Sequence, residues 1–149
     1  MFYTEFAANA QLNSRDVRSY ARRCFSDLRL KARLNKALSL FGQKHDLKHL
    51  CSAGQPHYAG LHTIALDKIT GSESRTGDFD HNFNPLSDSL KDRWVNVMAA
   101  RLSGTPMPPI DLLKAGDEYY VRDGHHRISV ARALGEGFIE AQVTSMTDE

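Results

Sequence analysis

The sequence of 149 residues lacks the features that mark several specialised classes of protein. Its two cysteines, Cys24 and Cys51, form no Cys-x-x-Cys pair, so neither a disulfide scaffold nor a structural zinc site is indicated. The longest apolar runs, such as Val95–Leu102, fall well short of the about 18 residues that a membrane helix needs. Met1–Ala10 has no basic region followed by an apolar core, so no signal peptide is expected. We therefore expect a soluble, cytoplasmic protein with reduced thiols and no membrane partner.

The overall composition of the sequence is typical of an ordinary folded domain. With 41% hydrophobic and 25% charged residues, the sequence excludes a wholly disordered or collagen-like chain. A chain of this size buries roughly 70% of the surface that it exposes when unfolded. Its core therefore needs neither a metal nor a disulfide.

Basic residues are concentrated in one segment, although the net charge is only +1. Between Ser14 and Lys48, ten Lys and Arg residues stand against three Asp residues. The apolar spacing predicts a helix with a cap at Ser14 and a stop at Gly42, and a shift after Leu28 predicts a kink or two helices. A nucleic-acid interface, a solvated face and a face for a protein partner or second copy all stay open. The residues that would contact DNA are Arg15, Arg18, Arg22, Arg23, Arg29 and Arg33.

Strand and helix signals alternate along the rest of the chain. We expect a basic helical extension over residues 1–52, a linker over Ser52–Gly60, and a second domain over residues 61–149. Thr70–Pro85 has the composition of a long polar loop, a kind of segment that is usually functional or disordered. Predicted elements are a strand at Leu61–Ile69, a helix at Ser87–Leu102, a hairpin of Ile110–Leu113 with Glu118–Arg122, a helix at His125–Leu134 and a strand at Ile139–Val143. This order predicts an α+β fold with a small mixed sheet.

The most informative stretch follows the hairpin. A glycine, Gly124, separates the predicted strand from a helix whose first turn is His125–Arg127. Helix N-termini offer unpaired N–H groups to phosphate, glycine allows close approach, and arginine can bind a phosphoryl oxygen in a bidentate manner. An ordinary ion pair of Arg127 with Asp123 or Asp117 is the alternative.

The box Gly124-His125-His126-Arg127, continued by a helix up to Gly135, resembles the ParB/sulfiredoxin superfamily, whose signature is a Gly-x-x-Arg box at the start of a helix after a hairpin. The resemblance covers roughly Leu61–Val143. It implies a small fold of helices and strands that binds the phosphates of ATP or another nucleotide. His125 stands where sulfiredoxins carry their reactive cysteine, so sulfiredoxin activity is not expected.

The resemblance also implies roles for individual residues. Phosphates would be held by Gly124, His125, His126 and Arg127, with Ser74 and Arg75 from the loop after the first strand. The candidate catalytic residues are His126, Asp80 and Arg75. Asp78 and Asp80 suit a Mg²⁺ ion, a solvated acidic loop being the alternative. His45 and His49 have metal-like spacing, but no third ligand is near them in the sequence.

The leading functional hypothesis is a nucleotide-binding ATPase or phosphohydrolase, with divalent-metal-dependent DNase activity as an extension. One alternative is a nucleotide-switched module that binds DNA or protein without catalysis. The other is a kinase that phosphorylates a small hydroxyl compound such as serine. Fold alone does not choose among these activities.

Overall fold

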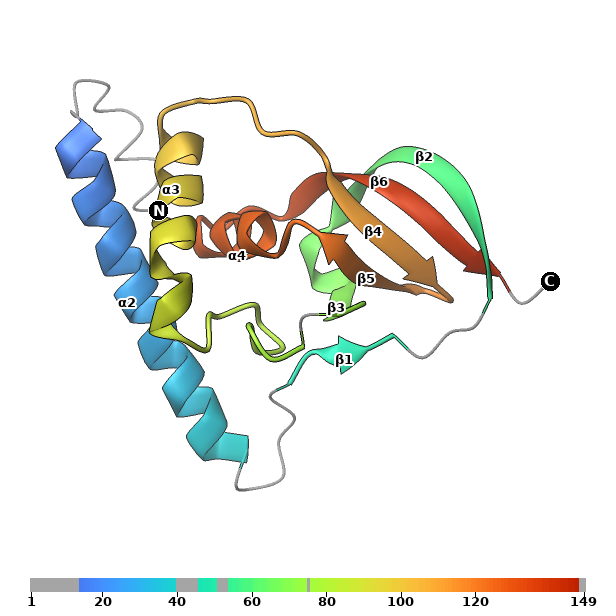
Figure 1. Cartoon of the computed structure of the whole chain (residues 1–149), viewed down its shortest axis with the longest axis horizontal. Coiled ribbons are helices and arrows are strands. Elements are labelled where there is room, and N and C mark those ends of the chain that lie inside the picture. Colours follow the sequence, from blue (N-terminus) through green and yellow to red (C-terminus); the bar gives the residue numbers. More distant parts are fainter. Residues whose placement is uncertain (1–13, 40–45, 51–53, 75, 148–149) are drawn as a thin grey trace.

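The computed structural model describes residues 14–39, 46–50, 54–74 and 76–147 (Figure 1). Within these ranges the chain forms three α-helices and a six-stranded mixed sheet, which confirms the predicted α+β class. The elements are α2 (Ser14–Ser39), β1 (Lys48–His49), β2 (Gln55–Ala65), η1 (Leu66–Lys68), β3 (Ile69–Ser72), η2 (Asp88–Leu90), α3 (Lys91–Leu102), β4 (Ile110–Ala115), β5 (Glu118–Asp123), α4 (His125–Ala133) and β6 (Phe138–Thr147).

The sheet has the strand order β1-β3-β5-β4-β6-β2. The β4–β5 and β2–β6 pairs are antiparallel, whereas β1–β3, β3–β5 and β4–β6 are parallel. β2 pairs with β6 from Gln55 opposite Thr147 to Ala65 opposite Phe138, with a register shift between Tyr58 and Gly60. The linker predicted up to Gly60 is therefore wrong from Gln55 onward, because that segment is an edge strand.

Helix α2 runs without interruption over 26 residues, so the predicted division into two helices is wrong. The sequence pattern that suggested it consists of two separate apolar stripes on one helix. One stripe is buried and consists of Val17, Ala21, Phe25, Leu28 and Ala32. The other stripe, formed by Leu30, Leu34 and Leu38, stays exposed at 54%, 56% and 47%. The predicted stop at Gly42 lies outside the described residues.

The helices pack side by side, with α3 between α2 and α4 (Figure 1). The ring of Phe25 in α2 meets Trp94 of α3 edge-on at 5.7 Å, and Trp94 Nε1 donates to Ser129 Oγ of α4 at 2.8 Å. Phe25 and Leu47 belong to the same core cluster as the apolar residues of the sheet. The predicted boundary at residue 52 therefore does not separate two packing units.

The elements around the hairpin agree with the sequence prediction. Ser87 caps the 3-10 turn η2 that leads into α3, because its side chain accepts from Ser89 N at 3.1 Å. Gly116 has the positive φ of 63° in the hairpin turn, and Gly135 has a φ of 74° just after α4.

Among the helices of the described ranges, none combines the length and the apolar character that are needed to cross a membrane.

Candidate functional site

The junction between β5 and α4 is built around Gly124. This residue has a φ of 114°, and a Cβ placed on it would lie 2.4 Å from Ile110 Cγ2. Both the backbone conformation and the close approach of β4 therefore require glycine. As the N-cap residue, Gly124 has no side chain that could accept a hydrogen bond from the first turn of α4. The first N–H groups of an α-helix have no acceptor within the helix itself, and they lie at the positive end of the helix dipole.

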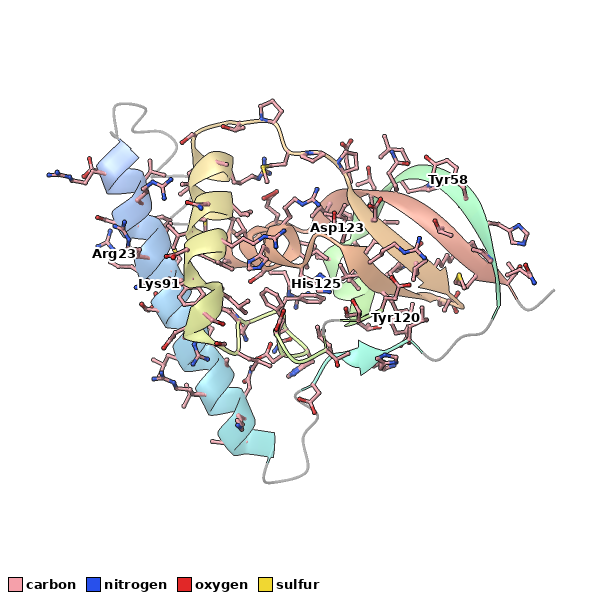
Figure 2. All side chains as sticks on the ribbon, viewed as in Figure 1. Arg23, Tyr58, Lys91, Tyr120, Asp123 and His125 are labelled. Carbon is pink, nitrogen blue, oxygen red and sulfur yellow. The ribbon has the colours of Figure 1, made fainter. Side chains whose placement is uncertain are left out.

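A pocket of about 140 Å³ lies over this N-terminus. It is lined by residues of α3, the segment before β4, the end of β5 and the first turn of α4. They are Arg93, Val97, Met107, Arg122, Asp123, Gly124, His125, His126 and Arg127. Figure 2 shows Asp123 and His125 where the sheet meets the helices. Three arginines and one aspartate line the pocket, and Arg122 also pairs with Glu73, its Nε lying 3.2 Å from Oε2. The remaining positive charge and the helix dipole both favour an anion.

Arg127 is held by three acceptors. Its Nη1 donates to the carbonyl oxygens of Pro108 at 2.6 Å and Pro109 at 3.2 Å, and its Nη2 donates to Asp123 Oδ2 at 3.3 Å. The ion pair with Asp123, expected as the alternative to phosphate binding, is therefore present. Asp123 is the exposed partner, with 64% of its side chain accessible, whereas the Arg127 side chain is 17% accessible. The guanidinium is fixed by backbone carbonyls on one side and by a solvated carboxylate on the other.

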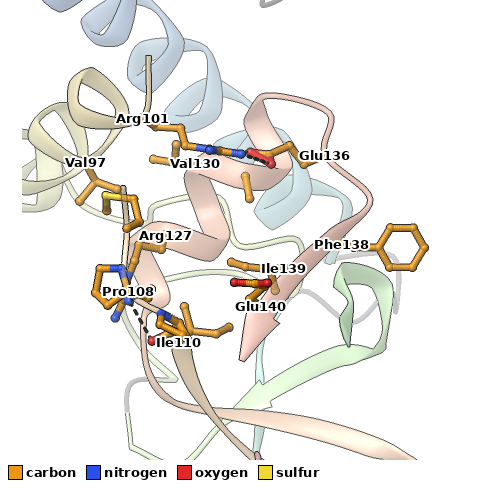
Figure 3. Close-up of a pocket in the computed structure, with 13 residues that line it drawn as sticks. Val97, Arg101, Pro108, Ile110, Arg127, Val130, Glu136, Phe138, Ile139 and Glu140 are labelled. Atoms are coloured by element: carbon orange, nitrogen blue, oxygen red, sulfur yellow. Dashed lines mark hydrogen bonds and ion pairs between the residues drawn. The ribbon is translucent and has the colours of Figure 1, made fainter. Parts of the chain in front are cut away.

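A second pocket, of about 300 Å³, adjoins the first (Figure 3). The two share Val97, Met107 and Arg127. The second pocket is lined by polar and apolar groups in similar measure, from the segment before β4, from α4 and from β6. Phe138 points away from the other labelled side chains in Figure 3. Its polar rim includes the ion pair of Arg101 with Glu136, with Nε 3.0 Å from Oε1. A cationic pocket and a pocket of mixed polar and apolar lining therefore meet at Arg127.

The two histidines of the box are both 5% exposed. His125 Nε2 lies 2.7 Å from Ser72 Oγ, which connects the start of α4 to the end of β3. The ring of Phe79 stacks on His125 at 6.1 Å and meets His126 edge-on at 5.3 Å. Both residues line the cationic pocket, and both of their rings pack against the ring of Phe79.

Asp80 has a structural role and does not line either pocket. Its side chain is fully buried, and each oxygen accepts two hydrogen bonds. Oδ1 accepts from the backbone N–H groups of Asn82 and Asn84, both at 2.9 Å. Oδ2 accepts from the Nδ2 groups of Asn84 at 3.1 Å and Asn35 at 3.2 Å. Asp80 therefore stabilises the turn that holds the Phe79 ring against His125 and His126.

This arrangement corrects two predictions for the acidic loop. A carboxylate whose acceptor positions are filled and that is closed to solvent does not fit the role of general base. Nor do Asp78 and Asp80 fit a shared Mg²⁺ site, because a metal on either oxygen of Asp80 would compete with the two hydrogen bonds that this oxygen already accepts. Across the described ranges, no group of three His, Cys, Asp or Glu side chains could hold a metal ion.

The loop after β3 contributes less than expected. Ser74 is exposed, its N–H donates to Ser72 Oγ at 3.3 Å, and it is not among the residues that line the cationic pocket. Arg75 and His45 lie outside the described residues, and His49 is exposed on β1.

Two further arginines, Arg93 and Arg122, line the cationic pocket, and neither was predicted from the sequence. Arg122 comes directly before Asp123 in the strand, so its position next to the box was open to inference. The sequence around Arg93 gives no sign that this residue lies near the box, because Arg93 belongs to α3 and reaches the pocket through the packing of the helices.

The arginines expected to contact DNA divide into two groups. Arg18 donates to Asn96 Oδ1 at 2.8 Å, and Arg29 donates to Asp88 Oδ1 at 3.0 Å and to the carbonyl of Pro85 at 3.2 Å. The other four are exposed on α2, namely Arg15, Arg22, Arg23 and Arg33. The first pair attaches α2 to the segment 85–96, and the second group faces solvent.

The start of α4 therefore combines a cluster of arginines with an adjoining pocket of mixed polar and apolar lining. No family model, curated protein or solved structure matches the chain. The interpretation of this site therefore depends on its own residues.

Proposed function

We propose that the chain binds the phosphate groups of a nucleotide at the start of α4, as its resemblance to the ParB/sulfiredoxin superfamily implies. The observation that carries the proposal is the convergence of Arg93, Arg122 and Arg127 on the pocket over the N-terminus of a nine-residue helix whose N-cap residue is a glycine. Backbone N–H groups and arginine side chains together are the donors that phosphate oxygens prefer in proteins.

The contacts of Arg127 favour replacement of its partner Asp123 by a phosphate when a nucleotide binds. Its bonds to the Pro108 and Pro109 carbonyls hold the guanidinium in place, so little side-chain entropy remains to be lost. Its 3.3 Å contact with Asp123 is the one that a phosphate would replace. Asp123 is exposed, so its carboxylate can return to water at small cost.

The adjoining pocket suits the rest of a nucleotide. A volume of about 300 Å³ lies at the lower end of the range typical of ligand sites, and its lining by Pro108, Ile110 and Ile139 favours a flat apolar group such as a base. Because the two pockets share Arg127, one ligand can place its phosphates in the first and its base in the second.

Hydrolysis of the bound nucleotide is a second candidate, favoured by His126. His126 lines the cationic pocket, and its imidazole is the group that would accept a proton from an attacking water. Mg²⁺ would neutralise charge on the phosphates, and it would arrive with the nucleotide because Asp78 and Asp80 do not form its site. If no turnover occurs, the same pocket would serve a nucleotide-switched module that binds DNA or protein. If the phosphoryl group passes to a small hydroxyl compound such as serine instead of water, it would serve a kinase.

Calorimetric titration of ATP and of adenosine, each with Mg²⁺, tests the proposal. We expect ATP to bind and adenosine to bind far more weakly. Arg93→Gln should weaken ATP binding roughly tenfold or more, since it removes a charged phosphate donor. Arg23→Gln is the matched control, because it removes the same charge from an exposed site on α2 that lines neither pocket. Absence of ATP binding, or an equal weakening in the two variants, would contradict the proposal. Phosphate release in the same samples decides between hydrolysis and binding alone.

A further inference from the structure

The arginines of α2 are arranged as one continuous stripe. With 100° between successive residues, six basic positions fall within about 60° of the helix circumference. These positions, the arginine stripe, are Arg15, Arg18, Arg22, Arg29, Arg33 and Lys36. The stripe extends over about 30 Å at 1.5 Å per residue. It lies next to the buried face and is distinct from the exposed leucine stripe, which is centred about 130° further round the helix.

Two arginines of the stripe are fixed by hydrogen bonds, and three others are exposed. Arg18 and Arg29 are fixed by Asn96 and Asp88, which orients the helix and places the stripe beside α3. Arg15, Arg22 and Arg33 are exposed, and none of them makes a hydrogen bond or ion pair within the described part of the chain. Three guanidinium groups on one line are therefore available to an outside partner.

We infer that this arginine stripe binds the phosphate backbone of a nucleic acid, an interaction independent of the nucleotide pocket. The charge of α2, with eight Lys and Arg residues against two Asp, is complementary to a polyanion. Five of the six residues are arginines, the side chain best suited to phosphate. No large apolar side chain lies within the stripe, whereas the core of a protein interface is depleted of charge and enriched in apolar groups. These features favour nucleic acid over an acidic protein surface.

A pair of double variants tests the inference. Arg22→Gln/Arg33→Gln removes two charges from the stripe, and Arg23→Gln/Lys31→Gln removes two charges from other faces of the same helix. Although Arg23 was expected from the sequence to contact DNA, it lies about 110° round the helix from the centre of the stripe. All four side chains are exposed, so both variants should keep the thermal stability of the wild type. Net charge is then equal in the two variants, and only its position differs.

Binding to a labelled duplex DNA is measured by fluorescence anisotropy over a series of salt concentrations. We expect the wild type to bind with a strong salt dependence, and the stripe variant to bind roughly tenfold or more weakly. The slope of log K against log salt should fall in magnitude by about 1.8, because two cations that neutralise phosphates are removed. The control variant should stay near the wild type. An equal weakening in the two variants, or wild-type binding to anionic vesicles but not to DNA, would overturn the inference.

Discussion

Arg127 Nη1 lies 2.6 Å from the carbonyl oxygen of Pro108, so the arginine that begins α4 also fixes the segment that enters β4. Arg127→Ala should therefore affect stability as well as binding. We expect a decrease of about 1–3 kcal/mol in the free energy of unfolding, since charge-assisted hydrogen bonds to two carbonyls disappear. Urea unfolding measures this decrease. Arg93→Ala, an exposed site, should stay within about 0.5 kcal/mol of the wild type while weakening ATP binding. A fully stable Arg127→Ala protein would show that the carbonyl contacts contribute nothing.

We expect Asp80 to stabilise the fold through its hydrogen bonds and not by binding a metal ion. Asp80→Ala leaves two backbone and two side-chain donors without their acceptor, which should cost roughly 2–5 kcal/mol. The exposed hairpin residue Asp117 gives the control, and Asp117→Ala should change stability by no more than about 0.5 kcal/mol. Chelation of divalent ions should leave the Tm of the nucleotide-free wild type unchanged. A Tm that falls on chelation, in the wild type but not in Asp80→Ala, would restore the metal-ligand hypothesis.

Gly124 should tolerate no side chain. Its φ of 114° and the distance of 2.4 Å from a Cβ placed there to Ile110 Cγ2 make Gly124→Ala both strained and overpacked. Backbone strain alone costs about 1–3 kcal/mol, and the steric conflict adds to it. Gly137→Ala is the comparison, because a Cβ there has nothing within 4 Å and the φ is not in the left-handed region. Thermal unfolding of the two variants should differ clearly. Similar melting temperatures would mean that the junction relaxes without cost.

The ion pair between Arg29 and Asp88 should give a small acid-dependent contribution to stability. The hydrogen bond from Arg29 lowers the pKa of Asp88 below its ordinary value. A carboxyl group whose pKa is lower in the folded state stabilises the fold fully above its unfolded pKa, and that contribution is lost as the pH falls through the folded pKa. Wild type should therefore melt slightly above Asp88→Asn at neutral pH, and the difference should vanish in acid. A difference that is constant with pH would exclude this origin.

The elements predicted correctly from the sequence are those with strong local signals. The hairpin of β4 and β5 has a glycine turn at Gly116, and α4 is bounded by Gly124 and Gly135, so short-range chemistry defines both. These same elements carry the Gly-x-x-Arg box. The part of the candidate site that lies on consecutive residues was therefore open to prediction.

The features that were not predicted depend on contacts between distant segments. Gln55–Gly60 has the Pro and Gly content of a loop, but pairing with β6 makes it a strand. Asp80 looked like a solvated ligand because a sequence does not show the four donors that surround a carboxylate. Arg93 enters the pocket only because α3 packs beside α4. Each of these features depends on tertiary packing, which cannot be read from local residue patterns.

Phosphate binding at the start of α4 is tested most directly by following the backbone amides of His125, His126 and Arg127 in the NMR spectrum during titration with ATP and, separately, with adenosine. These N–H groups begin the helix, so hydrogen bonds to phosphate should shift their signals strongly with ATP. Adenosine should move them far less, and the amides of exposed turn residues such as Asp117 should not respond to either ligand. Amides of His125–Arg127 that stay unchanged with ATP, or that shift equally with adenosine, would contradict the proposed phosphate site.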